Sequence, residues 1–278
     1  MKLVKISRDG RCAQGFLEHD LVHVSGHWVD GPAIDAPFTL SHATDLVALR
    51  ASAGEAMPLA SVTLEAPIDA RAKLICVGIN YRDHASEIKA DDATSPMIFT
   101  RFQDSIVAPG APLERPKVSQ NFDFEGEIAI VIGRTARSIA LADAMSFVAG
   151  YSCFMDGSIR DYQKHSVTAG KNFWRTASLG PHVVPAGDFA PADPALTTRL
   201  NGEVVQSSRA SLMIFDIATI IEYLSRWTEL RAGDVIATGT PGGVGARRTP
   251  PLWMKPGDRI EVEFEGVGIL SNPVVDAP

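Results

Sequence analysis

The stretch FDFEGEIAIVIG, residues 122–133, combines the two features from which the fold and the candidate site can be worked out. After Glu127 the chain runs through apolar, mostly β-branched residues, as a buried strand does. Glu125 and Glu127 lie two apart, so on a strand they project from one face, about 7 Å apart. Two carboxylates beside a buried segment cost free energy unless a cation lies between them. The stretch therefore predicts a buried strand whose start carries a cation site.

The composition and charge exclude several classes of protein. The chain has 278 residues, 45% of them hydrophobic, and a net charge of -7, which does not suit a nucleic-acid surface. No run reaches the roughly 18 apolar residues of a membrane span, and residues 1–12 lack the apolar core of a signal peptide. Cys12, Cys76 and Cys153 are too widely spaced for a disulfide framework or a zinc site. We therefore expect a cytoplasmic protein that binds neither nucleic acid nor membrane.

Short strands dominate the expected secondary structure. Residues 1–68 read as a small β-rich N-terminal domain, whose strands are separated by turn signals at Asp9-Gly10, Ser25-Gly26 and Asp30-Gly31-Pro32. Residues 258–265 alternate charged and apolar side chains, as a half-exposed antiparallel strand does. Because helices are few and no regular βαβ alternation occurs, the predicted fold class is α+β, mainly β.

Two helices are expected within this β-rich pattern. A short polar helix is predicted over Arg82–Lys89. Residues 211–224 are apolar nearly all round, which predicts a largely buried helix whose start Ser211 could cap. The Ala- and Asp-rich stretch Lys89–Pro96, directly after the first helix, is expected to be mobile.

Three histidines near the N-terminus invite a metal-site interpretation that their context opposes. His19, His23 and His27 are four residues apart, a spacing that would align them on a helix. Their neighbours are strand and turn residues, however, and on a strand positions four apart lie about 13 Å from each other. We therefore expect surface histidines on a hairpin, since at that separation they could not share one ion.

A third carboxylate offers a partner for the glutamate pair. Asp156 ends a second strand-like segment, residues 149–155. Three carboxylates without paired His or Cys make the oxygen-rich kind of site that Mg²⁺, Mn²⁺ or Ca²⁺ prefers. Solvated acidic residues at a strand end are common, so spacing alone leaves both interpretations open.

Several stretches in a fixed order resemble the fumarylacetoacetate hydrolase family, over residues 73–278. They are ICVGINYRDHASE (75–87), FEGEIAIVIG (124–133), GYSCFMDGSIRDYQ (150–163), GKNF (170–173), MIFDIATIIEYLS (213–225) and GDVIATGTPGGVG (233–245). The resemblance implies a catalytic domain over residues 69–278 built on a rolled, mixed β-sheet, and a homodimer. It also implies a divalent metal, Mg²⁺ or else Mn²⁺ or Ca²⁺, held by Glu125, Glu127 and Asp156.

The resemblance also implies catalytic residues. His84 and Glu87 match the His and Glu of the family's mobile lid helix, and residues three apart share one helix face. The carboxylate can then orient the imidazole and strengthen it as a base for water. Lys171 in GKNF matches a lysine beside the metal, where its charge can stabilise an enolate. Without the family match, each of these side chains would read as an ordinary solvated group.

Substrate-binding positions carry over in the same way. Arg160 and Gln163 match substrate-contacting residues, and an arginine can donate two parallel hydrogen bonds to a carboxylate. The glycine-rich segment at 238–245 lacks the Lys-Ser/Thr ending of a phosphate loop. In the family this turn lines the pocket, which places Thr240 near the substrate carboxylate, and its glycines let the backbone approach the ligand.

Two stretches depart from common family patterns. Phe99-Thr100-Arg101-Phe102 stands where many members have Lys-Pro, and Asn172-Phe173-Trp174 stands where many have Ser-Phe-Asp. Both lie near the expected pocket, so they affect the expected substrate more than the expected chemistry.

These residues predict a small-molecule 2-keto acid substrate and a hydrolase. In a 3-acylpyruvate, water activated by His84 and Glu87 would attack the distal carbonyl. Cleavage of the C–C bond would then release pyruvate as an enolate held by the metal and Lys171. The same site could serve a 2-keto acid tautomerase or isomerase, or an oxaloacetate decarboxylase. A metal-dependent binder of small dicarboxylates is the non-enzymatic alternative, although binding alone needs neither a base nor a lid.

Overall fold

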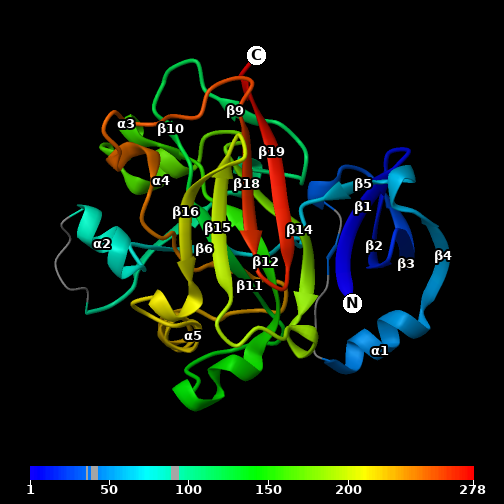
Figure 1. Ribbon diagram of the computed structural model, residues 1–278. Helices are drawn as coiled ribbons and strands as arrows, with labels where there is room; N and C mark the ends of the chain where they lie inside the picture. Colours follow the sequence, from blue (N-terminus) through cyan, green and yellow to red (C-terminus); the bar gives the residue numbers. More distant parts are fainter. Residues whose placement is uncertain (36, 39–42, 89–93) are drawn as a thin grey trace.

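The computed structural model describes residues 1–35, 37–38, 43–88 and 94–278, and strands predominate in it (Figure 1). The strands form a 12-stranded sheet, a five-stranded sheet and a two-stranded ribbon. The predicted α+β, mainly β class and the mixed, rolled sheet are confirmed. Within the described residues, no helix is long and apolar enough to cross a membrane.

The N-terminal strands form a meander of hairpins. They are β1 (Lys2–Arg8), β2 (Arg11–Glu18), β3 (Leu21–Asp30), β4 (Ala53–Pro58) and β5 (Thr63–Glu65). The predicted turn at Asp9-Gly10 is confirmed, with positive φ at both residues. The predicted turn at Ser25-Gly26 is wrong, because both residues lie inside β3. Gly26 has a φ of +81° near a shift of register, so it marks an irregularity within the strand.

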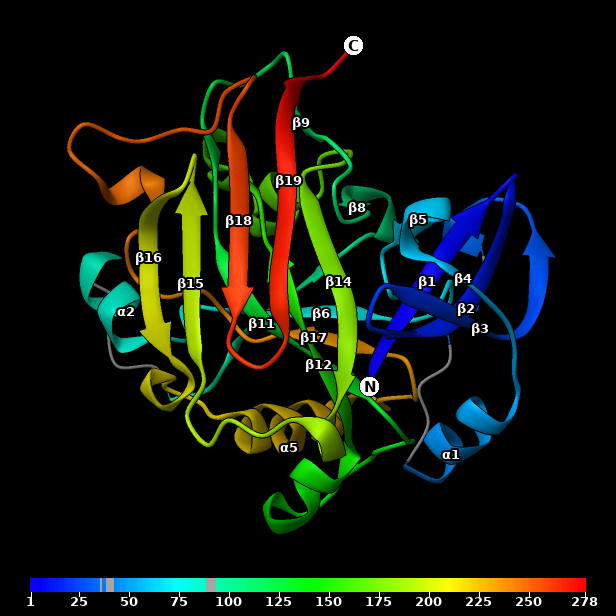
Figure 2. The same cartoon turned by 45° about the vertical axis from the view of Figure 1, so that its right-hand side comes forward.

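The N-terminal strands continue directly into the main sheet. Its order is β4-β3-β2-β1-β14-β12-β11-β17-β6-β7, and β1 joins β14 by the pair Leu3↔Val183 (Figure 2). The remaining strands of this sheet are β6 (Leu74–Gly78), β7 (Met97–Arg101), β8 (Ile106–Val107), β11 (Gly126–Ile132), β12 (Val148–Met155), β14 (Ala177–Pro185) and β17 (Val235–Ala237). One apolar cluster contains Leu3 and Phe16 together with Val183. A boundary at residue 68 stays a prediction.

A five-stranded sheet packs on β11 and β12 and closes the main core (Figures 1 and 2). Its strands, in order, are β16 (Glu203–Arg209), β15 (Ala195–Leu200), β18 (Arg259–Phe264), β19 (Gly268–Asp276) and β9 (Leu113–Arg115). Ile128 and Ile130 of β11 share one apolar core with Leu196 and Val262. The alternating burial of β18 and its antiparallel neighbours confirm the strand predicted there.

The helices are few and short, as predicted. They are α1 (Ala43–Ala51), α2 (Arg82–Ile88), α3 (Arg160–Gln163), α4 (Val167–Lys171) and α5 (Ile217–Trp227). Helix α2 confirms the polar helix, and residues 89–93 of the stretch expected to be mobile lie outside the described residues.

The predicted start of the long apolar helix is wrong. Ser211 lies in a short 3₁₀ turn, and α5 begins six residues later at Ile217. Asp216 caps it, accepting a hydrogen bond of 2.8 Å from the Thr219 N–H. Ile214 and Phe215 form a bend instead of a helical turn, and the Phe215 N–H donates to the Asn80 side chain at 2.9 Å. The buried residues of α5 are Ile220, Ile221, Leu224 and Ser225, so one face of the helix is buried and the helix is less buried than predicted.

The histidine triplet lies on the β2–β3 hairpin, as predicted. His19 occupies the turn with a φ of +54°, whereas His23 and His27 lie on β3. His23 stacks on Phe16 with ring centroids 4.9 Å apart. Among the described residues the triplet is not one of the groups whose atoms come close enough to hold a metal.

Candidate metal centre and active-site cavity

Antiparallel pairing of β11 with β12 brings the three predicted metal ligands together. Glu125 and Glu127 flank the first residue of β11, and Asp156 follows the last residue of β12. Gly126 pairs with Met155, so the start of one strand lies beside the end of the other. The Asp156 N–H donates to the Glu125 carbonyl at 2.8 Å. One carboxylate oxygen from each of the three residues lies within 4.8 Å of the others, and all three are buried.

The glycine between the two glutamates allows the second sheet to approach. A Cβ at Gly126 would lie 2.0 Å from the Thr198 hydroxyl of β15. The Gly126 N–H also donates to the Gln206 side chain at 2.9 Å. Any larger residue would push the five-stranded sheet away from the two carboxylates.

Two buried cations, Arg101 and Lys171, and the half-buried Arg160 neutralise part of this carboxylate cluster. Lys171 Nζ, at the end of α4, donates to Glu125 at 2.7 Å and to Asp156 at 2.5 Å. Arg101, at the end of β7, donates to the other Asp156 oxygen and to the Gly157 carbonyl. Arg160 lies 2.5 Å from Glu125 in an ion pair. Although burial acts to raise it, Lys171 and Arg160 lower the pKa of Glu125 to about 2.

Glu127 differs from its neighbour because no cation contacts it among the described residues. Its Oε2 accepts a 2.8 Å hydrogen bond from the Gly239 N–H. Burial and the nearby Asp156 raise the pKa of Glu127 well above its ordinary value. With Asp123, which pairs with Arg160, four carboxylates face three cations and one negative charge is left over. A divalent cation at this oxygen-only site would compensate Glu127, so the residues fit a hard divalent ion.

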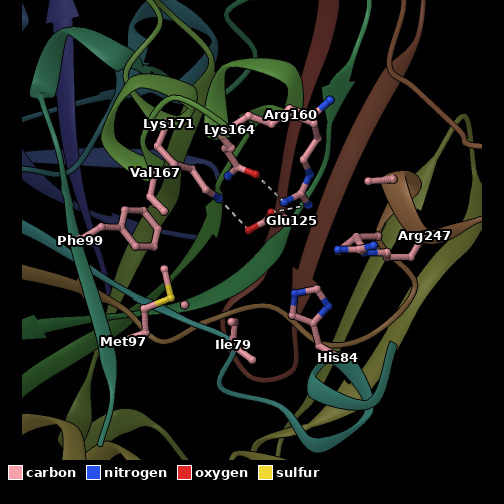
Figure 3. Close-up of a pocket in the computed structure, with 14 residues that line it drawn as sticks. Ile79, His84, Met97, Phe99, Glu125, Arg160, Lys164, Val167, Lys171 and Arg247 are labelled. Carbon is pink, nitrogen blue, oxygen red and sulfur yellow. Dashed lines mark hydrogen bonds and ion pairs between the residues drawn. The ribbon is translucent and has the colours of Figure 1, made fainter. Parts of the chain in front are cut away.

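The predicted catalytic pair is assembled on α2. His84 Nδ1 lies 3.3 Å from Glu87 Oε2, and the other oxygen of Glu87 accepts a 2.7 Å hydrogen bond from the Gly243 N–H. With Nδ1 facing the carboxylate, we assign the proton to Nδ1, which leaves Nε2 free. Figure 3 shows the imidazole pointing into the cavity below Glu125.

The glycine-rich segment cradles carboxylates of the protein itself. Besides the bonds to Glu127 and Glu87, the Gly245 N–H donates to Asp123 at 2.7 Å. Thr240 is buried; its hydroxyl donates to the Gly126 carbonyl at 3.0 Å and accepts from Gln206 at 2.8 Å. The segment thus fixes the carboxylate cluster and the His84–Glu87 pair relative to each other.

A cavity of about 460 Å³ opens beside these groups (Figure 3). Its described lining comprises Gly78, Ile79, His84, Met97, Phe99, Glu125, Arg160, Gln163, Lys164, Val167, Lys171, Val244, Ala246 and Arg247. Arg160 and Gln163 meet there in a 3.0 Å hydrogen bond. The structure therefore brings His84, Lys171, Arg160 and Gln163 to one cavity, whereas Thr240 is not part of that lining.

The sequence analysis missed the roles of three residues. Arg101 was noticed only as a departure from family pattern, yet it contacts a metal-ligand candidate. Asp123 stands inside the opening FDFEGE motif and anchors Arg160 at 2.7 Å. Arg247 lines the cavity, and the basic pair that it forms with Arg248 after the glycine-rich segment was a usable signal.

The two departures from family pattern contact each other. The Phe102 N–H donates to the Asn172 side chain at 2.5 Å, and the same side chain donates to the Thr100 carbonyl at 3.1 Å. Asn172 therefore ties the end of β7 to the end of α4, which carry Arg101 and Lys171.

Several known proteins are similar to this chain in sequence and in fold. The family model described as fumarylacetoacetate (FAA) hydrolase C-terminal matches residues 73–275. Over 240 residues the chain is 40% identical to the human protein named oxaloacetate tautomerase FAHD2A, mitochondrial, covering 84% of this chain and 76% of that protein.

Solved structures extend the similarity over the full length. The 5-carboxymethyl-2-hydroxymuconate delta-isomerase of Mycobacterium smegmatis has a TM-score of 0.81 at 34% identity, with 100% of both chains covered. The fumarylacetoacetate hydrolase of Exiguobacterium antarcticum has a TM-score of 0.80 at 37% identity, again with 100% of both chains covered. With its family-specific segment matched from residue 73 to residue 275, the chain belongs to the fumarylacetoacetate hydrolase family.

Proposed function

We propose that this enzyme is a divalent-metal-dependent tautomerase or isomerase that interconverts the enol and keto forms of 2-keto acids. The observation that carries the proposal is one cavity whose lining joins Glu125, a member of the buried carboxylate triad, to His84, which pairs with Glu87. The names of the human and mycobacterial relatives, a tautomerase and an isomerase, support this chemistry over the hydrolysis that the sequence analysis placed first.

The division of chemical roles follows from the donor set. A divalent cation bound by Glu125, Glu127 and Asp156 supplies Lewis acidity that stabilises negative charge on substrate oxygens. His84 takes the hydroxyl proton of the enol at Nε2 and returns a proton to C3, while the C2=C3 double bond becomes C2=O. No proton is gained or lost overall. Glu87 holds the imidazole in the orientation that this transfer requires.

The proposed substrate roles differ in how much geometric support they have. Lys171 faces the cavity, but it donates hydrogen bonds to Glu125 and Asp156, so its first role is to hold these ligands ionised. Arg160 and Gln163 reach the cavity and can contact a substrate carboxylate. Because its hydroxyl already has two protein partners, Thr240 acts on the substrate only through the position of its backbone.

Hydrolysis of an acylpyruvate is the second candidate, because the same His84–Glu87 pair could activate water and a hydrolase is among the similar structures. Decarboxylation of oxaloacetate would use the same triad without a base. A non-catalytic dicarboxylate binder has less support, since it would not need the aligned imidazole.

The test uses the ultraviolet absorbance of enol-oxaloacetate and product identification. With Mg²⁺, we expect the purified protein to accelerate loss of the enol absorbance above the uncatalysed rate, leaving oxaloacetate intact. A parallel acylpyruvate panel would reveal hydrolysis by the appearance of pyruvate, and carbon dioxide from oxaloacetate would reveal decarboxylation. Tight retention of 2-keto acids without turnover would replace the proposal with the binder.

The proposal also covers the oligomeric state of the protein, the identity of its ion and its location in the cell. We propose a homodimer, with Mg²⁺ as the physiological ion, and a cytoplasmic location. Light scattering on the eluted protein and imaging of a fluorescent fusion test assembly and location; comparison of Mg²⁺, Mn²⁺ and Ca²⁺ at equal concentration tests the ion.

A further inference from the structure

The lining of the cavity has a strong charge asymmetry. Among its described residues, Glu125 is the one carboxylate, whereas Arg160, Lys164, Lys171 and Arg247 are cationic. Met97, Phe99 and Val167 supply an apolar wall suited to a carbon skeleton. An anionic ligand with a short apolar body fits these surroundings.

Arg160 and Lys171 already have protein partners, so only their remaining N–H groups are left for a substrate. Each of the three guanidinium nitrogens of Arg160 contacts an oxygen, from Asp123, Gln163 or Glu125. Lys171 donates to two carboxylates and also lies 3.3 Å from the Asp156 carbonyl. A divalent ion would turn the surplus negative charge of the cluster into one positive charge, which suits a single substrate carboxylate.

Arg247, like Lys164, is an exposed cation of the lining whose charged group has no hydrogen bond or ion pair within the described residues, and its backbone is held in place. It ends a 3₁₀ turn (Gly245–Arg247) whose N–H groups at Gly245 and Ala246 donate to Asp123. The next residue, Arg248, donates to the Gly243 and Val205 carbonyls. Within the described part of the chain, no side chain forms a hydrogen bond or ion pair with the Arg247 guanidinium. Figure 3 shows it across the cavity from Lys171 and beside His84.

We propose that Arg247 binds the distal carboxylate of a dicarboxylic 2-keto acid and makes dianionic substrates preferred. The inference deepens the proposed function and rests on it. The substrate's 2-keto acid end lies at the carboxylate cluster, and its far end reaches across the cavity to the planar fork of Arg247. The Arg247 side chain is exposed, and its planar guanidinium can donate two parallel hydrogen bonds to a carboxylate, so less side-chain entropy is lost per hydrogen bond than with a lysine.

The test compares two ligands that differ only in the distal carboxylate. Calorimetry of the Mg²⁺-loaded protein measures Kd for 2-oxoglutarate and for 2-oxopentanoate. Arg247→Ala should weaken 2-oxoglutarate binding about tenfold to a hundredfold, the usual effect of losing hydrogen bonds to a charged group, and leave 2-oxopentanoate within about twofold. Arg247→Lys should recover part of the loss. Arg71→Ala is the matched control, because that side chain is 90% exposed and does not line the cavity.

The outcomes separate this inference from the proposed function. Equal weakening of both ligands, or the loss appearing in Lys164→Ala instead, would overturn the role of Arg247. If the wild-type protein binds 2-oxopentanoate as tightly as 2-oxoglutarate, the preference for dianions is also wrong. Failure of the proposed function would appear elsewhere, as absence of enol–keto turnover by a wild-type protein that still shows the ligand preference.

Discussion

The carboxylate cluster and the rim of the cavity differ in how many of their polar groups already have partners within the protein. In the cluster, Glu125 and Asp156 are buried and bound by permanent cations, and Glu127 alone lacks one among the described residues. At the rim, which comprises His84, Glu87 and Arg247, an imidazole nitrogen and a guanidinium keep free hydrogen-bonding capacity. This difference suits the cluster to the proposed role of holding an ion, and the rim to the proposed role of acting on a substrate.

The largest effect should follow from removing the least compensated ligand. We expect Glu127→Gln to abolish tight Mg²⁺ binding and to lower kcat/KM about a thousandfold, since metal stabilisation of the transition state is worth several kcal/mol. Steady-state kinetics across a Mg²⁺ titration provides the measurement. Glu203→Gln, an exposed glutamate on β16, removes the same charge elsewhere and should leave activity unchanged. Normal kinetics in Glu127→Gln would mean that the cluster is not the metal site.

Loss of the buried ammonium should affect both stability and rate. Lys171→Met leaves Glu125 and Asp156 short of a cation, which should cost about 3–5 kcal/mol of unfolding free energy without metal. We also expect a 100-fold or larger fall in kcat, of about the size seen when a charge-stabilising donor is removed. Urea denaturation with and without Mg²⁺ measures the first effect and kinetics the second. A variant as stable as the wild type without metal would show that Lys171 does not hold the cluster together.

A rim substitution should leave the cluster intact. His84→Gln is expected to lower kcat about 100-fold, the usual contribution of a positioned acid–base group, while Mg²⁺ affinity stays unchanged. Glu87→Gln should cause a smaller fall, because the imidazole remains but is less well oriented. For both variants, pre-steady-state kinetics measures the rate of proton transfer, and steady-state kinetics measures kcat as a function of pH. Unchanged kcat in His84→Gln would assign the proton transfer to another group.

Much of this organisation could be predicted from sequence, and the reasons for the misses are physical. The apolar run after Glu127 predicts β11, and i, i+2 geometry predicts that Glu125 and Glu127 lie together. Asp156 was a candidate from its place at a strand end, but deciding for a metal site required the family resemblance, because pairing of β11 with β12 is a tertiary contact. Arg101 and Arg247 gave no periodic signal, since their roles depend on which strand end or turn faces the cavity. Ser211 was mistaken for a cap because local propensity cannot show that the Phe215 N–H bonds to the distant Asn80 side chain and not within a helix.

A buried histidine outside the cavity should make the stability of the fold depend on pH, independently of the rim residues. Burial lowers the pKa of His182 to about 4, and its Nε2 lies 2.7 Å from the Val267 carbonyl. The unfolded chain, with a pKa near about 6.5, binds the proton first, so stability is full above about pH 6.5 and falls down to about pH 4. The loss should be about 3 kcal/mol. Urea denaturation against pH should show this slope in the wild type and a shallower one in His182→Gln, whereas identical slopes would exclude His182 as its source.

The central claim is that the carboxylate cluster holds the metal while the rim acts on the substrate. Calorimetric titration of Mg²⁺ into the wild type, Glu127→Gln and His84→Gln tests this most directly, with turnover measured on the same samples. We predict that Glu127→Gln loses Mg²⁺ binding and turnover together, whereas His84→Gln binds Mg²⁺ like the wild type and loses turnover alone. Mg²⁺ binding that survives Glu127→Gln, or disappears in His84→Gln, would contradict the account.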